Sequence, residues 1–576
     1  MSRRIALIGL AAAVTTGSLG FLAPTAGAED PPSLVARGQF AAQGDDDGEA
    51  GAEISAFDPS TDRLFSTNGA QNRIDVVDLS DINAPTAIDS VDLSSYGAGV
   101  QSVAVHDGLV AAVVSAAPKT DPGTLVLFDA ATLAELNSLT VGALPDMVTF
   151  TPDGSTVLVA NEGEPLCTAY DDQTDTPTFV DPDGSVSVVD VSGGAAAATV
   201  QTATFTAFNA QQATLASAGV RFNFFDHTVA QQVEPEYVTV SEDGSTAWVS
   251  LQEANAVAVL DIASATITGI LPLGLKDHST GQYDIDASNE DGPGGDELAG
   301  NFQSWPVSGM YMPDAIAAFE IDGTEYFMTA NEGDAREWFV DDDEDDELCF
   351  ADVERIKDLT LDTTLVPFAD PTIQDDDQLG RLNATTTAFS IQNGDDEYTD
   401  LAVFGGRSAT IRDGASGAIV WDSADSISTD LERITLANGT FADNRSDDKG
   451  SEPEAVAVTE AYGRTLAVVG LERTSGVVLY DITDPTAPTF LQYIAPAGDE
   501  SVEGLFFVSA DDSPSGRPLV LVSNEVSSTV RVLEVLGTDV VAEVATPDTP
   551  DTPDTPTPVP ASLAAVPTRA NPSFTG

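Results

Sequence analysis

Two segments of the chain carry the same four residues, Ala-Asn-Glu-Gly, each after an apolar run and before acidic side chains. One copy contains Asn161 and Glu162, and the other contains Asn331 and Glu332, with Asp334 close behind. Amide and carboxylate oxygens are the ligands that hard cations such as Ca²⁺ prefer. Clustered oxygens also suit a cationic or polyhydroxyl ligand. We therefore predict that these five side chains bind a ligand, with calcium as the expected cofactor.

Two rare basic side chains follow the second copy. Arg336 lies in "EGDAREW" and Arg407 lies in "FGGRSAT". A guanidinium group pairs strongly with carboxylates and with other anionic groups. Arg336 and Arg407 are therefore candidate ligand-binding residues as well.

A separate group of oxygens lies in "YDIDASNEDGPGGDE" (283–297), where Asp284, Asp286, Asn289 and Asp291 precede Gly292. The composition is that of a calcium-binding loop, but the spacing and the bidentate Glu of an EF-hand are missing. We predict a metal site at these four residues, with an ordinary acidic loop as the alternative. The denser run "DDDEDDE" (341–347) is more typical of a solvated loop.

Catalytic patterns are sparse. None of the three histidines lies in a His-Glu-x-x-His arrangement, and the chain has no Gly-x-Ser-x-Gly elbow before a helix and no Gly-rich phosphate loop. Paired carboxylates carry little information in a chain with 94 Asp and Glu residues. A binding or adhesion module is therefore favoured over an enzyme. The alternative is an extracytoplasmic metal-assisted hydrolase, either a phosphoesterase or a glycosidase, that uses rim carboxylates.

The overall charge excludes some partners. The 22 basic and 94 acidic residues give a formal net charge of -72, while the apolar fraction of 42% is enough to build a core. Such an acidic surface repels nucleic acid and is tolerated best where salt screens it. We expect a globular, halophilic protein that does not bind nucleic acid. Its surface partner, a glycan or a protein, is not specified by the sequence, and a monomer is expected.

The two ends of the chain differ from the region between them. Residues 1–28 have the basic start, apolar run and "AGA" site of a signal peptide, which predicts a secreted or cell-surface protein. No later segment has the apolar length of a membrane span. Residues 546–576 are a Pro/Thr/Asp-rich linker or a truncated sorting tail. Cys167 and Cys349 form a disulfide or remain two free thiols.

Residues 29–545 repeat one pattern. Each copy has an acid, an alternating strand, a turn, a second apolar strand and a third strand, as in "PEYVTVSEDGSTAWVSLQEANAVAVLDI" from Pro235. Repeats of three or four strands about every 45 residues are typical of a β-propeller. We predict an all-β propeller with long loop insertions. Seven starts indicate seven blades, and a further copy at Asp400 either adds an eighth blade or completes the fifth.

Propeller geometry brings the acidic starts together. The start of the innermost strand and the corner after the second strand lie on the same face of a blade, so both sets of side chains are predicted to surround one channel mouth. The predicted inner ring is Glu53, Gln101, Asp146, Glu236, Asp314, Glu454 and Glu503, and the outer set is Asn161, Glu162, Glu253, Asn331, Glu332, Glu472, Asn524 and Glu525. The alternative is that these groups accept or donate hydrogen bonds that hold neighbouring blades.

Several long motifs resemble one known family. "LVANEGEP", "WPVSGMYMPDAIAAF", "FGGRSATIRD" and "PEAVAVTEAYGRTLAVVGLERTSGVVLYDI" occur in the order found in the choice-of-anchor I domain family, which includes proteins of the mesenchyme-specific cell surface glycoprotein type. The resemblance implies a secreted or surface-held propeller of the YVTN/WD40-like kind. Some family members carry an alkaline phosphatase label, but the chain lacks the serine, histidine and aspartate pattern of such a metal site.

Overall fold

The computed structural model describes residues 31–44, 50–171, 176–292, 300–340, 348–424, 426–432, 435 and 443–537. The predicted signal peptide (1–28), the tail from residue 546 and the acidic run at 341–347 lie outside these ranges. Among the described residues, no helix has the length and apolar character needed to cross a membrane.

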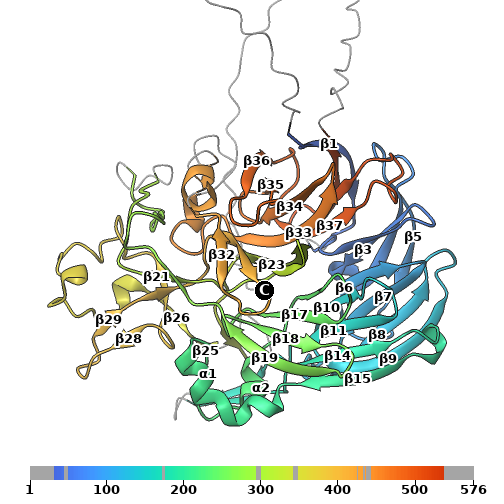
Figure 1. Ribbon diagram of the computed structural model, residues 1–576. Coiled ribbons are helices and arrows are strands. Elements are labelled where there is room, and N and C mark those ends of the chain that lie inside the picture. The colour runs from blue at the N-terminus through green and yellow to red at the C-terminus, as the bar shows by residue number, and fades with distance from the viewer. Residues whose placement is uncertain are drawn as a thin grey trace, which may run out of the picture.

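Seven four-stranded antiparallel sheets are arranged around a common axis (Figure 1). The first four are β2 (Ser55–Asp58), β3 (Arg63–Asn68), β4 (Arg73–Asp78) and β5 (Thr86–Asp92); β6 (Gly99–His106), β7 (Leu109–Ser115), β8 (Pro122–Asp129) and β9 (Glu135–Ala143); β10 (Pro145–Phe150), β11 (Thr156–Asn161), β14 (Ser185–Asp190) and β15 (Thr199–Thr204); and β16 (Val238–Val240), β17 (Thr246–Leu251), β18 (Ala256–Asp261) and β19 (Thr266–Pro272).

The remaining three sheets complete the ring and confirm the predicted propeller. They are β22 (Ile316–Ile321), β23 (Thr324–Asn331), β31 (Ser408–Asp413) and β32 (Ile419–Asp422); β33 (Pro453–Ala461), β34 (Arg464–Leu471), β35 (Gly476–Asp481) and β36 (Thr489–Ile494); and β37 (Val502–Val508), β38 (Leu519–Asn524), β39 (Thr529–Leu536) and β1 (Ser33–Ala41). The copy from Asp400 supplies β31 and β32, so it completes the fifth blade and adds no eighth.

The seventh blade closes the ring by joining distant parts of the chain. Strand β1 pairs antiparallel with β39, from Ser33 opposite Leu536 to Ala41 opposite Thr529. Arg37 on β1 also pairs with Glu534 on β39 at 2.5 Å. The innermost strand of the first blade, β2, contacts the innermost strands of both the second blade (β6) and the seventh (β37). The ring of blades is therefore closed.

Apolar side chains fill the spaces between neighbouring blades. One core cluster packs Val113 and Leu127 of the second blade against Val148 and Val157 of the third. At the outer turns, an aspartate accepts hydrogen bonds from a hydroxyl residue just after it. Asp153, for example, accepts from the backbone and the hydroxyl of Ser155 at 3.0 and 2.8 Å. The "PDGS" sequence therefore forms a compact hairpin turn.

Two insertions interrupt the ring. The first leaves the third blade as the hairpin β12 (Leu166–Asp171) and β13 (Thr176–Val180). The second leaves the fifth blade between β23 and β31. It includes the hairpin β24 (Glu337–Phe339) and β25 (Leu348–Ala351), the strands β26 (Val353–Arg355) and β27 (Asn383–Thr385), the pair β28 (Ile391–Gln392) and β29 (Tyr398–Asp400), and β30 (Ala402–Val403).

A five-stranded sheet beside the ring uses parts of this second insertion. Its order is β20 (Leu275–Asp277), β21 (Ser308–Met310), β30, β27 and β26, and it lies to the left in Figure 1. The short helices α1 (Gln212–Ala218) and α2 (Val229–Gln232) lie between the third and fourth blades in the chain.

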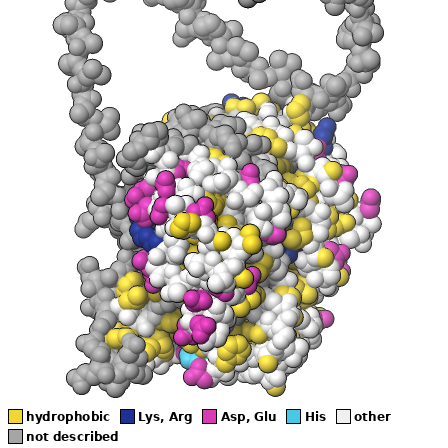
Figure 2. Space-filling model, turned by 90° about the vertical axis from the view of Figure 1, so that its left-hand side faces the viewer, with side chains coloured by type: hydrophobic (Ala, Val, Ile, Leu, Met, Phe, Trp, Pro, Cys, Tyr) yellow, Lys and Arg dark blue, Asp and Glu magenta, His cyan; other side chains and the backbone are white. Residues whose placement is uncertain are grey.

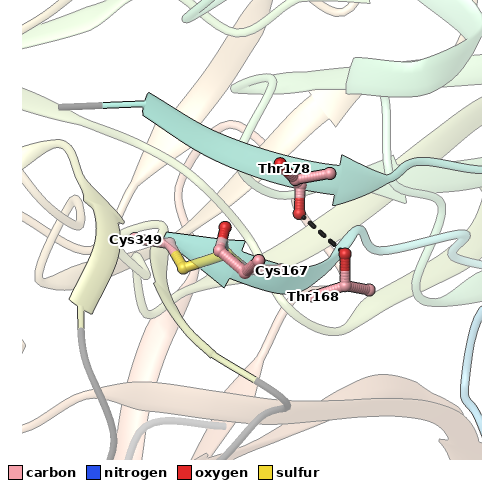
Figure 3. The surroundings of a disulfide bond; sticks show 5 residues. Cys167, Thr168, Thr178 and Cys349 are labelled. Atoms are coloured by element: carbon pink, nitrogen blue, oxygen red, sulfur yellow. Dashed lines mark hydrogen bonds between the residues drawn. A yellow bond between two sulfur atoms is a disulfide. The ribbon is translucent and has the colours of Figure 1, made fainter. Parts of the chain in front are cut away.

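The two insertion hairpins are joined covalently. Cys167 of β12 and Cys349 of β25 form a disulfide with an S–S distance of 2.00 Å (Figure 3). Next to it, Thr168 donates its hydroxyl to the Thr178 carbonyl at 3.2 Å within the first hairpin. The bond therefore fastens the third-blade insertion to the fifth-blade insertion, 182 residues away in sequence.

Removing this disulfide should lower the melting temperature. Crosslinks that close long loops typically contribute about 2–4 kcal/mol to the free energy of unfolding. We expect a Cys167→Ser, Cys349→Ser double variant to melt earlier than the oxidised protein by scanning calorimetry. Reductant should lower the wild-type melting temperature and leave that of the double variant unchanged. Equal melting temperatures for oxidised protein and double variant would contradict a stabilising role.

Candidate functional site

The innermost strands of the seven blades surround a central cavity of about 550 Å³. Every residue of the predicted inner ring lines this cavity: Glu53, Gln101, Asp146, Glu236, Asp314, Glu454 and Glu503. Glu162, Glu253, Glu332 and Glu525 of the outer set line it as well. Among the lining residues that the structure describes, fourteen carry carboxylates and two, Lys119 and Arg336, carry basic groups. A mobile cation entering this space would meet a strongly negative potential.

Bulges in the innermost strands aim four of these side chains at the axis. The β6–β7, β10–β11, β33–β34 and β37–β38 ladders each gain one extra residue on the innermost strand, at the positions of Gln101, Asp146, Glu454 and Glu503. A residue in a bulge leaves the ladder and is turned away from its regular direction. Sequence periodicity alone does not show these bulges, although each coincides with the polar residue that begins an apolar strand.

The repeated Ala-Asn-Glu-Gly motif now has a structural explanation. Asn161 is fully buried, accepts the Gly142 N–H at 2.9 Å and donates to the Ser187 hydroxyl at 3.0 Å. Glu162 faces the cavity, and Gly163 takes a φ of 71°, a left-handed conformation that suits glycine. The amide therefore holds the blade corner while the next residue presents its carboxylate to the cavity.

In the second Ala-Asn-Glu-Gly motif the asparagine is again buried within the blade and the acid again faces the cavity. Asn331 is fully buried and donates to the Ser408 carbonyl at 2.7 Å, so it joins β23 to β31. Glu332 and Asp334 line the cavity. Gly333 has a φ of 86°, and a Cβ at this position would lie 2.0 Å from the backbone nitrogen of Gly405. The structure thus places the two predicted asparagines within blades and the acids at the cavity.

Glu332 and Glu454, which line the cavity, come close enough to Glu472 for the three carboxylates to share one cation. One oxygen from each of Glu332, Glu454 and Glu472 lies within 4.8 Å of the other two, and all three side chains are buried. Glu332 follows β23, Glu454 lies in the β33 bulge, and Glu472 follows β34. The trio therefore combines the second-strand corner of the fifth blade with two positions of the sixth.

The hydrogen bonds of this trio are incomplete. Glu332 accepts from Lys449 Nζ at 2.5 Å and from Gln252 Nε2 at 2.7 Å. Glu472 accepts from the Ser501 hydroxyl at 2.8 Å and pairs with Arg473 Nη1 at 2.6 Å. Glu454 Oε2 is buried and meets no hydrogen-bond donor in the described part of the chain. The same holds for Glu236 Oε2 and Glu253 Oε2 elsewhere in the cavity. Buried oxygens without donors are costly unless a proton or a cation reaches them.

Burial and repulsion between neighbouring carboxylates raise the pKa of these acids. Burial, with the charges of neighbouring carboxylates, raises the pKa of Glu53, Glu253 and Glu472 to about 8. Burial raises the pKa of Asp146 to about 7. The same two causes raise the pKa of the other inner carboxyls well above its ordinary value, at Glu236, Asp314, Glu454 and Glu503. Without a cation, the cavity therefore retains protons near neutral pH.

Arg336, which lines the cavity, and Lys449, which contacts two of its acids, are already engaged. Arg336 Nε donates to Glu234 Oε2 at 2.8 Å, and its backbone N–H donates to Asp352 at 3.1 Å. Lys449, which comes from the segment before β33, contacts Asp334 at 3.1 Å as well as Glu332. These cations neutralise individual carboxylates and position them, but they are far fewer than the acids around them.

The remaining predicted site residues lie outside the cavity. Arg407 is buried and donates to the backbone carbonyls of Asp286, Ser446 and Asp448. Asp284 accepts from the Ser304 hydroxyl at 2.8 Å, and Asn289 accepts from Arg381 at 3.1 Å. Burial, with the charge of Asp443, raises the pKa of Asp286 to about 6, and burial, with the charge of Asp286, raises the pKa of Asp291 to about 6.

Sequence reasoning did not select Glu234, Lys449 or Asp443. Glu234 lies two residues before the inner-ring residue Glu236, in "VEPE", which is the one local signal. Lys449 and Asp443 come from the connection between the fifth and sixth blades, where no repeat predicts the path of the chain. Their contacts depend on how that connection folds back over the ring.

These features define a seven-bladed β-propeller with an acidic central cavity. Residues 53–485 match the choice-of-anchor I domain, so the chain belongs to this family and the predicted membership is confirmed.

Two relatives share part of the sequence. Gigasin-3a of Magallana gigas is 27% identical over 198 residues, which cover 29% of this chain and 69% of that protein. The mesenchyme-specific cell surface glycoprotein of Strongylocentrotus purpuratus is 27% identical over 348 residues, or 54% of this chain and 41% of that protein. Among solved structures, the WD40 domain of Toxoplasma gondii coronin has a TM-score of 0.43 and 8% identity over 88% of this chain and 87% of that one.

The raised pKa values predict how stability depends on pH. A carboxyl whose pKa is higher in the folded than in the unfolded protein binds more protons when folded, so stability falls as pH rises through the folded-state pKa. We expect the melting temperature in chelator to fall between about pH 7 and about pH 9, where Glu53, Glu253 and Glu472 lose their protons. His278 does not interfere, since burial lowers its pKa to about 3.

A Glu253→Gln variant, which removes one of these protons, should show a smaller fall over the same range. The measurement is thermal unfolding at constant ionic strength. A melting temperature that is constant or rises across this range would contradict the assignment.

Proposed function

We propose that the protein is a secreted or cell-surface binding module whose central cavity binds calcium. Glu332, Glu454 and Glu472 provide the first ligands. The observation that carries this proposal is the approach of their three oxygens to within 4.8 Å of one another, together with the buried Glu454 oxygen that has no donor among the described residues.

The chemistry of the lining favours a hard cation. The cavity-lining residues that the structure describes include many carboxylates and the amides of Gln101 and Gln252, but no histidine or cysteine. Oxygen ligands of this kind select Ca²⁺ or Mg²⁺ over Zn²⁺, and Ca²⁺ tolerates the irregular geometry and larger number of ligands that such a ring offers. A bound cation would also replace the protons that the crowded carboxylates otherwise retain.

The cavity suits capture of a ligand from solution. Trp338, Phe339 and Tyr237 add apolar surface to the acidic wall, so a ligand with a cationic or hydroxylated part could contact both. Family membership supports an extracytoplasmic location, because the family is named for a choice of anchor and one relative is a cell surface glycoprotein. On this proposal, calcium organises the cavity and completes the surface that contacts the partner.

Calcium titration by calorimetry tests this site. We expect saturable binding and a higher melting temperature with calcium than with chelator, since a ligand of the folded state stabilises it. A Glu454→Gln, Glu472→Gln variant should bind calcium in the cavity about tenfold more weakly or not at all.

The matched control is Glu460→Gln, an exposed carboxyl on the same strand as Glu454. It should bind like the wild type. Unchanged affinity and stoichiometry in the cavity variant would sink the proposal.

A further inference from the structure

We propose that the propeller axis binds a linear alkylammonium ligand, with its cationic group among the acids of the central cavity and its aliphatic chain in a second, less polar cavity. This inference rests on the proposed function as a binding module and names its ligand class, but it does not depend on calcium. Two observations carry it. The two cavities are continuous, and a buried carboxylate oxygen of Glu236 in the first has no donor among the described residues.

The second cavity has a volume of about 360 Å³ and adjoins the central one. Ile54, Ser102, Met147 and Tyr237 line both cavities, so the two spaces share a boundary. Most of the other residues that line the second cavity belong to β2, β6, β10, β16 and β37. These are the innermost strands of five different blades, so the second cavity continues the first along the axis.

In three of the blades, the lining of the axis changes from acidic to apolar within one residue. An apolar or aromatic residue directly follows the inner-ring acid of the first, third and fourth blades. Each of these acids lines the central cavity only, whereas the residue after it lines both cavities. The three pairs are Glu53–Ile54, Asp146–Met147 and Glu236–Tyr237. A strand rises about 3.3 Å per residue, so a ligand with its charge at the acids reaches apolar side chains with its first carbon atoms.

Apolar residues form most of the lining of the second cavity. Val105, Val240 and Phe506 are half-buried there, and the lining residues that the structure describes include no Asp, Glu, Lys or Arg. The Ser55 hydroxyl, one of the polar groups of the lining, already lies 2.8 Å from the Ser523 hydroxyl and pairs with it. The second cavity therefore favours an aliphatic chain over a second charged group.

Glu236 provides the anchor for the cationic group. It is 8% exposed and lines the central cavity, and its Oε2 meets no hydrogen-bond donor in the described part of the chain. The two basic side chains of the described lining donate to other acids, Lys119 to Glu164 at 2.5 Å and Arg336 to Glu234 at 2.8 Å. A primary ammonium group brings one positive charge and three N–H donors, which match a carboxylate oxygen that lacks a donor.

The combination of an acidic and an apolar cavity selects the ligand class. A metal ion would contact the carboxylates but make no use of the apolar cavity. A fatty acid would fill the apolar cavity, but the acidic ring would repel its carboxylate. In a lysine side chain, a peptide backbone follows the fourth methylene, so only a free amine carries a long unbranched chain beyond the acids. An alkylammonium ion therefore matches both parts of the axis.

Calorimetric titration of the full chain with linear alkylammonium chlorides tests the inference. In chelator and at fixed salt, we expect octylammonium to bind saturably at one site per chain. From butylammonium to octylammonium, each added methylene should tighten binding about fourfold, because each buries further apolar surface. Octanoate should not bind, because the acids repel it. Nα-acetyl-lysine methylamide, which lacks the long chain, should bind at least about tenfold more weakly than octylammonium.

Two variants separate the contribution of the cation from that of the chain. Glu236→Gln should weaken every member of the series by a similar factor, about tenfold, and leave the gain per methylene unchanged. Val240→Thr, which nearly keeps the volume of the side chain, should reduce the gain per methylene instead. The matched controls are Glu460→Gln, an exposed acid, and Ile88→Thr, at an apolar residue that is 46% exposed, and neither should change binding.

The calcium variant Glu454→Gln, Glu472→Gln should lose calcium binding but retain the gain in affinity per methylene, so failure of one proposal is distinguishable from failure of the other. Two results would overturn the inference. One is a wild-type protein that binds calcium but shows no saturable binding of octylammonium in chelator. The other is an affinity that is independent of chain length, or that neither Glu236→Gln nor Val240→Thr changes. If Glu236→Gln does not fold, the alkyl series and Val240→Thr still decide, because both report on the apolar cavity.

Discussion

Convergence of like charges at the propeller axis is the constraint on which this structure depends. Seven innermost strands must begin around one cavity, and six of the seven starts are carboxylates. In a space partly shielded from water these charges repel one another strongly, so they must be neutralised by protons, by basic side chains or by cations. Lys449 and Arg336 neutralise some of the carboxylates. The raised pKa of others, such as Glu454, reflects the unfavourable energy of ionising them in the buried cavity, and a bound cation would lower that energy.

The acidic residues of this chain serve at least two different purposes. On the face shown in Figure 2, Asp and Glu side chains are spread over the surface with few Lys or Arg between them. Many exposed aspartates hold turns. Hydrogen bonds from Ser155 and Thr151 lower the pKa of Asp153 to about 2, and those from Ser192 lower the pKa of Asp190. These groups remain ionised and stabilise hairpins, whereas the buried acids at the axis oppose folding when ionised. Net charge alone does not separate the two roles.

The two insertions add a disulfide and cavity-lining side chains to the repeated blades. The disulfide between Cys167 and Cys349 ties two of them together, and Arg336, Trp338 and Phe339 of the second reach the cavity. The rings of Phe224, Trp338 and Phe350 pack against one another near this junction, with centroids 4.7 to 5.9 Å apart. The ring thus provides the repeated carboxylates, while Arg336 of the second insertion and Lys449 of the connection before β33 neutralise some of them.

The sequence by itself determined the propeller and the inner ring of acids, because hydrophobic alternation and repetition are local properties of the chain. It left open whether the copy from Asp400 completes the fifth blade or adds an eighth, and the structure decided for the fifth. It could not determine that Asn161 and Asn331 turn inward to hold their blades while the adjacent Glu162 and Glu332 face the cavity, since this depends on the left-handed turn at the following glycine and on packing against the neighbouring strand. Nor could it bring Lys449 to Glu332 and Asp334. Those contacts join segments without repeats, so only the folded path of the connections decides them.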